Sequence, residues 1–284
     1  MRTLETPEAT LAYDVRGPLP TADGRPPLFM IAAPMGADGF GTLAGFFADR
    51  TVITYDPRGL GRSTRSDGRR EHTPEQNADD VHRIIEAVGG PVEMFASSGG
   101  AVTALALVAA HPQDVTTLVA HEPPLLTLLP DAERAVAAER AVQSAYQDKG
   151  WGHGMAAFIA LTSWSGEFTD DFLARPAPDP AAFGLPGDDD GNREDPLLSG
   201  VSDPVTAYRP DAAALAAAPT RVVIAVGEES QDLLTGRTSA AVARELGQEP
   251  VVFPGGHGGF LGGEYGQAGK PEAFAARLRE VLAG

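Results

Sequence analysis

Short apolar runs alternate with helical patterns along the first 120 residues of the chain. Residues 28–32 and 51–55 are mostly apolar and β-branched runs, and this pattern predicts buried strands. Residues 92–96 and 116–120 repeat it. Between these last two runs, residues 101–110 are apolar almost all round, as in a helix buried against a sheet. Strands that alternate with helices predict a mostly parallel sheet with helices on both faces.

A further helix is predicted after the second of these strands. Thr73 has the side chain of an N-cap, Pro74 suits the first helical position, and Gln76 completes a capping box. The residues 89–91, Gly-Gly-Pro, end the helix. Apolar residues at helical spacing predict its buried face: Ala78, Val81, Ile84, Ile85 and Val88.

The alternation of strands and helices stops between residues 123 and 210. This stretch has helical spacing, no clear strand pattern and both tryptophans of the chain, Trp151 and Trp164. The alternation then resumes, with a strand at 222–226, a helix at 239–246, a strand at 251–253 and a final helix from Pro271. We therefore expect one α/β core built from residues 1–122 and 210–284, with residues 123–209 inserted as a helical lid.

Composition excludes several classes of protein. The formal net charge is −17 and no basic run exceeds two residues, which argues against nucleic acid and anionic membranes as partners, since both require a basic surface. The absence of cysteine excludes thiolate metal sites and a cysteine nucleophile. The first residues lack the apolar core of a signal peptide, and the longest apolar stretch, residues 101–110, is about half a membrane span. We expect a cytoplasmic protein.

The strongest chemical signal is the segment Ala96-Ser97-Ser98-Gly99-Gly100, between a predicted strand and a predicted helix. A nucleophile elbow requires this context, with small residues on both sides of the nucleophile because the turn is tight. The Ser98 hydroxyl would then stand at the helix N-terminus, where the Gly99 amide and the helix dipole can stabilise an oxyanion. The alternative is an ordinary Gly/Ser turn.

A serine hydroxyl is inert without a base, and His257 is predicted to supply it. His257 follows the last strand and has two glycines on each side. Sites in open α/β sheets lie at this carboxyl edge of the strands. The alternative is a histidine in a flexible surface loop. The other histidines lack this context, and a structural role is predicted for each of them: His72, His82, His111, His121 and His153.

The acid of the triad has two candidate positions. It usually follows the penultimate strand in a Gly-x-x-Asp turn, but here Ser230 occupies the aspartate position. Glu122 ends the strand after the elbow helix, and the two prolines that follow can hold its carboxylate stiffly. The chain order Ser98, Glu122, His257 matches the order nucleophile, acid, base. Glu122 is therefore our first choice, and the acidic residues near the turn stay open: Glu228, Glu229 and Asp232.

The loop after the first predicted strand is expected to supply a second oxyanion donor beside Gly99. It reads Ala33-Pro34-Met35-Gly36. Pro34 has no N–H, so Met35 is the expected donor and Gly36 the next choice.

Residues 56–63, Asp-Pro-Arg-Gly-Leu-Gly-Arg-Ser, are rich in glycine like a phosphate-binding loop. They lack the Lys-Ser/Thr pair of such loops, and no helix follows closely. We predict a structural loop in which Asp56 and Arg58 brace the edge of the sheet.

With these motifs the chain resembles the α/β-hydrolase superfamily over nearly its whole length, and within it the zearalenone hydrolases, which open a macrocyclic resorcylic lactone. The segments that carry the closer resemblance are Ser97-Ser98-Gly99, His121-Glu122-Pro123-Pro124 and Pro254-Gly255-Gly256-His257. The resemblance implies that Glu122 is the acid and that a lid tryptophan contacts the substrate. Trp164 is the better candidate, with Phe158 and Trp151 as further pocket residues. Pro34 departs from the glycine that is usual in similar enzymes.

The expected activity is hydrolysis of an ester or lactone bond in a bulky apolar small molecule, through an acyl-enzyme and with no metal or cofactor. Two alternatives stay open on the same residues: cleavage of a C–C bond or cofactor-free perhydrolysis, and a ligand-binding protein without catalysis. A homodimer is an open option for assembly.

Overall fold

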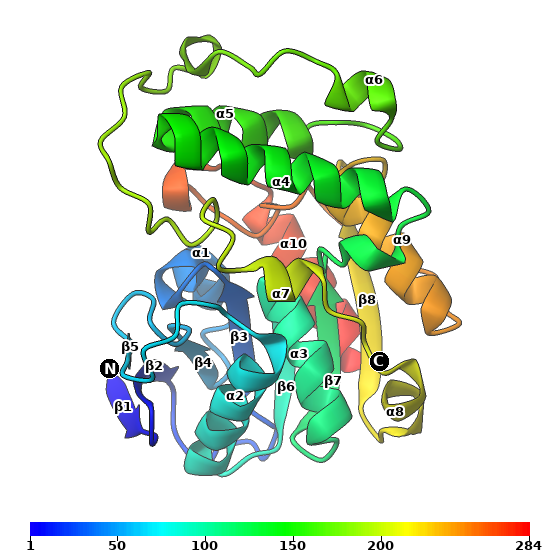
Figure 1. Cartoon of the computed structure of the whole chain (residues 1–284). Coiled ribbons are helices and arrows are strands. Elements are labelled where there is room, and N and C mark those ends of the chain that lie inside the picture. Colours follow the sequence, from blue (N-terminus) through cyan, green and yellow to red (C-terminus); the bar gives the residue numbers. More distant parts are fainter.

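A nine-stranded sheet forms the centre of the computed structural model, which describes residues 1–284 (Figure 1). The strand order is β1-β2-β4-β3-β6-β7-β8-β9, with β5 paired to β2. β1 and β2 run antiparallel to their neighbours, and the strands from β4 through β3 to β9 are parallel. The bounds are β1 Arg2–Glu5, β2 Ala9–Arg16, β3 Leu28–Ala33, β4 Val52–Tyr55, β5 Thr64–Arg65, β6 Val92–Ser98, β7 Val115–His121, β8 Arg221–Gly227 and β9 Val251–Phe253. The predicted mostly parallel sheet is confirmed.

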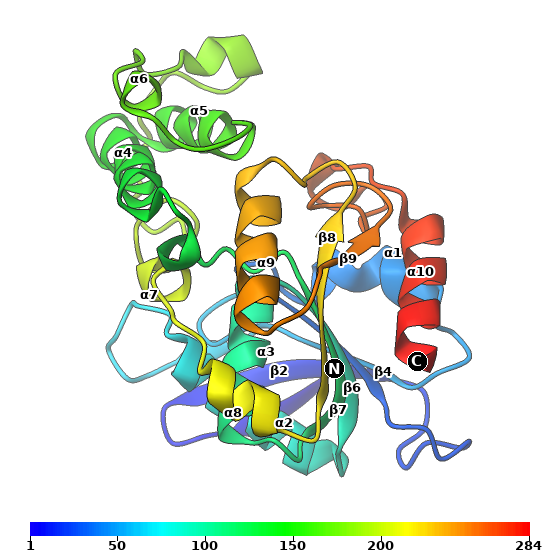
Figure 2. The same cartoon turned by 90° about the vertical axis from the view of Figure 1, so that its right-hand side faces the viewer.

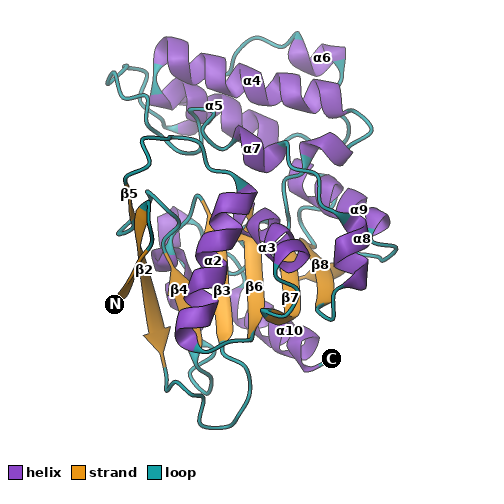
Figure 3. Cartoon of the chain, turned by 60° about the horizontal axis from the view of Figure 1, so that its bottom comes forward, coloured by secondary structure: helices purple, strands orange, loops and turns teal.

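Helices cover both faces of this sheet, as predicted. On one face α2 (Pro74–Val88), α3 (Gly99–Ala110), α8 (Ala212–Ala217) and α9 (Leu234–Glu245) enclose the larger apolar core. On the other face α1 (Gly41–Gly45) and α10 (Pro271–Ala283) enclose a second core. Figure 2 shows α1 and α10 on one side of the sheet, and Figure 3 shows α2 and α3 crossing the opposite face.

The first two strands lie outside the elements predicted from the sequence. β1 is mostly exposed at the sheet edge and has no apolar run. β2 carries a signal that could have revealed it, because Ala9, Leu11, Tyr13 and Val15 alternate with polar or small residues and point into the larger core.

Two details of the helices also differ from prediction. Thr73 caps α2 by accepting a hydrogen bond from the Gln76 amide at 3.3 Å, but the Gln76 side chain bonds Asp67, so the second half of the capping box is absent. Helix α9 begins at Leu234, five residues before the predicted start. Its early turn contains Gly236, where a Cβ would lie 2.0 Å from the Ser230 carbonyl, so glycine here serves packing rather than ending the helix.

The segment between β7 and β8 contains only helices and loops. Helices α4 (Ala132–Lys149), α5 (Trp151–Thr162), α6 (Asp170–Leu173) and α7 (Asp203–Thr206) lie beyond the carboxyl ends of the strands (Figure 1). Helices α4, α5 and α6 share a separate apolar cluster that includes Tyr146, Phe168 and Leu198, and Leu234 of α9 joins it to the rest of the molecule. Val205 of α7 packs into the larger core instead. We call residues 123–209 the helical insertion. None of the helices combines the length and apolar character that crossing a membrane requires.

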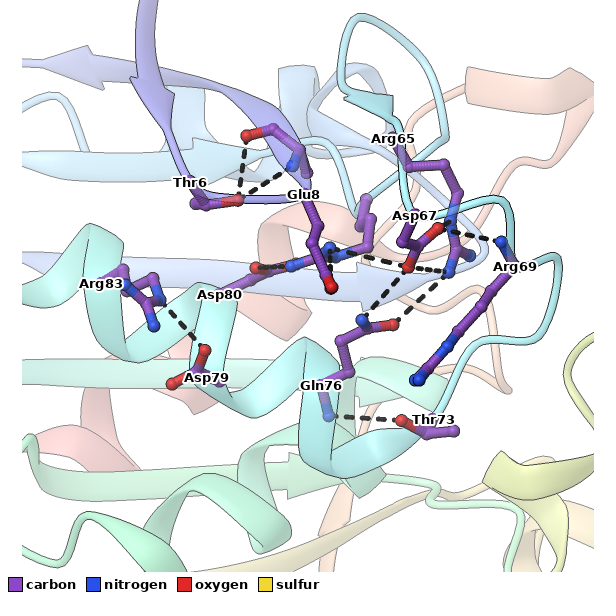
Figure 4. Close-up of polar contacts among 12 residues, drawn as sticks. Thr6, Glu8, Arg65, Asp67, Arg69, Thr73, Gln76, Asp79, Asp80 and Arg83 are labelled. Carbon is purple, nitrogen blue, oxygen red and sulfur yellow. Dashed lines mark hydrogen bonds and ion pairs between the residues drawn. The ribbon is translucent and has the colours of Figure 1, made fainter.

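The loop after β4 is a buried charged network, in line with the structural role predicted for it. Asp56 accepts hydrogen bonds from the Ala37 and Arg62 amides, both at 2.8 Å, and so ties this loop to the loop after β3. Arg58 forms two hydrogen bonds with Asp80 of α2, at 2.9 and 2.6 Å. Figure 4 shows Glu8, Asp67 and Asp80 gathered from three different segments, with Arg65 and Gln76 bonded to Asp67.

Candidate active site

Ser98 lies at the turn from β6 into α3, in a strained backbone conformation. Its φ is 55° and its ψ is −129°, which a residue with a side chain rarely adopts. The next two residues must be glycine. A Cβ on Gly99 would lie 2.8 Å from the Ala33 carbonyl oxygen, and one on Gly100 would lie 2.4 Å from the Ala32 Cα. This is the sharp strand–turn–helix geometry of a nucleophile elbow.

Glu122 follows β7 directly and is completely buried. Its φ of 50° turns the chain out of the strand, while its amide still donates to the Ala225 carbonyl of β8 at 3.1 Å. Its Oε1 accepts a hydrogen bond from the Gly227 amide at 2.8 Å, and its Oε2 accepts one from the Thr235 hydroxyl at 2.5 Å. The carboxylate is therefore fixed from both sides. Nothing local in the sequence pointed to Gly227 or Thr235 as its partners.

His257 lies in the loop after β9, and its Nδ1 is 2.6 Å from Glu122 Oε2. The other candidate acids do not reach it. Glu228 and Glu229 both form ion pairs with Lys270, at 2.6 and 2.7 Å. Asp232 is exposed. The structure thus pairs His257 with the acid that was the first choice from the sequence.

The charge state of Glu122 follows from this bonding. Burial alone would raise the pKa of the Glu122 carboxyl, but the hydrogen bond with His257 and the nearby imidazoles outweigh it and hold the pKa well below its usual range. The bond from Thr235 acts in the same direction. Glu122 is therefore an anion at neutral pH that can orient the imidazole and stabilise its protonated form.

Ser98 and His257 face the same cavity, whose volume is about 470 Å³. The Ser98 hydroxyl makes no hydrogen bond within the chain, and the His257 side chain is 44% exposed. A serine and a histidine that share an open pocket in this way are often loosely aligned until a substrate binds. The arrangement can bring a nucleophile, a base and an acid together at one carbonyl group.

The expected oxyanion donors lie on two neighbouring elements. Gly99 is the first residue of α3, so its amide has no partner within the helix. Met35 and Gly36 lie in the loop after β3, and neither amide donates a hydrogen bond within the chain. Because β3 and β6 are adjacent, with Ala33 opposite Ser98, this loop begins beside the elbow.

Of the three aromatic residues expected in the pocket, only Phe158 lines it. Trp164 instead packs against Phe172 and Arg175, and its indole N–H donates to the Glu167 carbonyl. Trp151 donates to Asp195. The expectation for the two tryptophans is corrected here, because partners within the helical insertion hold both indoles away from the cavity.

His121 lies directly behind the Glu122–His257 pair. It is fully buried among aromatic rings, Ser97 Oγ lies 3.1 Å from its Nδ1, and its Nε2 has no hydrogen-bond partner. Burial lowers the pKa of His121 to about 4, so the ring is neutral at physiological pH. This agrees with the structural role predicted for it.

One group of side chains has the composition of a metal site. The candidate ligand atoms of His82, His111 and Asp114 lie within 4.8 Å of one another. The two imidazoles are stacked with their centroids 3.7 Å apart, and His82 Nδ1 is 2.7 Å from Asp114. The group shares no residue with the cavity at Ser98.

Comparisons with known proteins agree with this architecture. The chain is 28% identical over 261 residues to the uncharacterized hydrolase YraK of Bacillus subtilis (strain 168), covering 91% of this chain and 89% of that protein. It superposes on a thermophilic esterase from Thermogutta terrifontis with a TM-score of 0.63 and 21% identity, covering 99% and 96% of the two chains. For the enol-lactonase from Burkholderia xenovorans LB400 the TM-score is 0.60 and the identity 17%, with 97% of each chain covered.

The model of the alpha/beta hydrolase family matches residues 28–277. The match begins at β3 and ends within α10, so it contains Ser98, Glu122 and His257. Since it extends over most of the sequence, the chain belongs to the alpha/beta hydrolase family.

Proposed function

We propose that this protein is a serine hydrolase that cleaves an ester or lactone bond through an acyl-enzyme. The observation that carries the proposal is the 2.6 Å contact between the buried Glu122 Oε2 and Nδ1 of His257, a residue that lines the same cavity as the strained Ser98. The proposed acid, base and nucleophile come from three separate segments at the carboxyl edge of the sheet.

The proposed mechanism begins with His257. Because Nδ1–H donates to Glu122, Nε2 is left without a proton and can take one from the Ser98 hydroxyl. Ser98 Oγ then attacks the substrate carbonyl, and the amides of Gly99 and Met35 or Gly36 hold the oxyanion. The protonated His257 returns its proton to the leaving alkoxide. Water, activated by His257 in the same way, hydrolyses the acyl-enzyme and releases the acid.

The cavity supports an apolar acyl or alcohol group next to the carbonyl. Its walls include Leu126, Val142, Phe158 and Leu161, and substrate pockets are generally apolar with a few polar anchors. The esterase and the enol-lactonase of similar fold favour ester and lactone substrates for this chain too. A resorcylic macrolactone is the more specific candidate. This candidate is supported by the similarity of the three motif segments to those of zearalenone hydrolases. It is weakened by Trp164, which does not line the cavity as the resemblance implied.

The test is a panel of aryl esters, alkyl esters and macrolactones, including zearalenone, assayed with the wild type and Ser98→Ala. We expect hydrolysis by the wild type and a loss of about 10⁴-fold or more in Ser98→Ala, as for other triad serines. Ser97→Ala is the matched control, because the neighbouring Ser97 faces His121, and we expect it to stay within about tenfold. Activity of Ser98→Ala within tenfold of wild type would contradict the proposal. If the protein cleaves only substrates with a scissile C–C bond and no ester or lactone, the same residues catalyse a different reaction.

A further inference from the structure

A carboxyl group lies in the wall of the cavity that contains Ser98. Glu139 of α4 is half-buried there, and its Oε2 accepts a hydrogen bond from the Thr206 hydroxyl of α7 at 3.1 Å. Its Oε1 accepts no hydrogen bond from any group of the chain. Since Glu139 lines the cavity, a bound molecule can reach this oxygen.

No ion pair neutralises the carboxylates in this part of the cavity. Asp203 of α7 also lines the cavity and accepts a hydrogen bond from the side-chain amide of Gln143 at 2.6 Å. Neither Glu139 nor Asp203 has an ion-pair partner within 4.0 Å, and the lining includes no lysine or arginine. A carboxylate that loses water without gaining a cation is destabilised, so the partly buried Glu139 favours a ligand that supplies positive charge. The exposed Asp203 carboxylate adds negative charge beside it.

The protonation of Glu139 reflects its burial and the nearby negative charge. Burial raises the pKa of Glu139 to about 7, and the Asp203 carboxylate adds to the rise, while the hydrogen bond from Thr206 and the charge of Arg140 act against it. A bound cation would favour the ionised form of Glu139, whereas an anionic group would be repelled by both carboxylates.

We propose that the cavity binds an ester or lactone that carries a protonated amine, with the ammonium group held by Glu139 and Asp203 and the carbonyl group at Ser98. This inference rests on the proposed function for the position of the carbonyl group. An ammonium group can donate a hydrogen bond to Oε1 of Glu139, which has no donor, and it brings a positive charge to the two carboxylates. A hydroxyl group supplies only the donor. The apolar side chains that line the same cavity fit the alkyl chain that joins the two ends of such a substrate.

The experiment compares esters that differ only at the far end of the chain. The ethyl esters of 6-aminohexanoic and 8-aminooctanoic acids are paired with those of heptanoic and nonanoic acids, in which a methyl group replaces the ammonium. Wild type, Glu139→Gln and Glu133→Gln are assayed with both pairs. Glu133→Gln is the control, because Glu133 is an exposed glutamate on the same helix.

We expect the wild type to prefer the amino ester in at least one pair. Glu139→Gln should reduce that preference in kcat/KM by at least about tenfold, mostly through KM, since it removes one partner of a hydrogen-bonded charge pair. Hydrolysis of the uncharged esters should change little, and Glu133→Gln should resemble the wild type. If the wild type hydrolyses the uncharged esters without preferring the amino esters, this inference fails and the proposed function stands.

A binding measurement separates the inference from catalysis. Calorimetry with the wild type should show hexylammonium binding more tightly than 1-hexanol, and Glu139→Gln should remove the difference. Equal binding of the two ligands, or a difference that persists in Glu139→Gln, would overturn the amine site whether or not any ester is cleaved. Failure of the protein to hydrolyse any ester or lactone, with hexylammonium still bound through Glu139, would instead count against the proposed function alone.

Discussion

Two residues with left-handed backbone conformations, Ser98 and Glu122, contribute the nucleophile and the acid of the proposed triad. Such conformations are costly for residues with a side chain, and they persist only where the surroundings enforce them. At Ser98 the surroundings are the close approach of Gly99 and Gly100 to β3. At Glu122 they are the hydrogen bonds to Gly227 and Thr235. Residues strained in this way cluster at functional sites.

The first prediction at this scale concerns the acid. Glu122→Gln should lower kcat by roughly 10²- to 10⁴-fold, because an amide neither stabilises the imidazolium nor enforces the tautomer of His257. Steady-state kinetics on the best ester of the panel measures the effect. Glu228→Gln is the control, since Glu228 pairs with Lys270 at the surface, and its effect should be mild. If Glu228→Gln reduces kcat as much as Glu122→Gln, the assignment of the acid is wrong.

Ser98 and His257 could be predicted from residues that are adjacent along the chain, because glycines and strand ends leave a local pattern. The choice of Glu122 required a comparison of two strand ends. It was decided by Ser230, which occupies the position where an aspartate is usual. Glu139 could not be predicted in the same way. Its place in the cavity depends on how α4 and α7 pack together, and helix–helix packing leaves no signal in either helix alone.

At the scale of elements, the contact between the helical insertion and α9 depends on a buried ion pair. Asp131, at the start of α4, bonds the guanidinium of Arg237 in α9 and accepts the Phe168 amide at 2.6 Å. Arg237 also donates to the Gly166 carbonyl at 2.8 Å. Three segments therefore meet at one carboxylate whose side chain is only 3% exposed.

Asp131→Asn should destabilise the fold by about 3 kcal/mol at pH 7, because removing one partner of a buried pair leaves the other charge uncompensated. Burial would raise the pKa of Asp131, but the bonds from Arg237 and the Phe168 amide hold it below its usual value. The ionised Asp131 thus contributes fully to the free energy of unfolding above the ordinary carboxyl pKa of about 4, and this contribution is lost as the pH falls below that value. Urea unfolding at pH 7 and pH 3 should show a large difference from wild type at pH 7 and a smaller one at pH 3.

Asp170→Asn is the matched control, since Asp170 forms an ion pair with Arg134 of α4 but its side chain is 84% exposed. Exposed pairs contribute about 1 kcal/mol or less. Equal destabilisation by the two variants, or a gap between Asp131→Asn and wild type that widens in acid, would show that the buried pair does not hold the helical insertion in place.

At the scale of the whole molecule, the alternation of strands and helices was sufficient to predict the parallel sheet and the helical segment that interrupts it. The antiparallel edge was missed, because β1 is exposed and has no apolar run. The tryptophans of the helical insertion were misplaced for a related reason. Their surroundings are set by contacts within the insertion, such as Trp164 with Phe172, and a family resemblance in the core motifs carries no information about those contacts.

The central claim, that Ser98 is an activated nucleophile, is tested most directly by covalent labelling with a fluorophosphonate and mapping of the adduct by mass spectrometry. Such reagents react with serines that a neighbouring base activates, whatever the natural substrate. We predict a single adduct on the peptide that contains Ser98, no adduct in Ser98→Ala, and slower labelling in Glu122→Gln. An adduct on another residue, labelling of Ser98→Ala at the wild-type rate, or no labelling of the wild type would contradict the account.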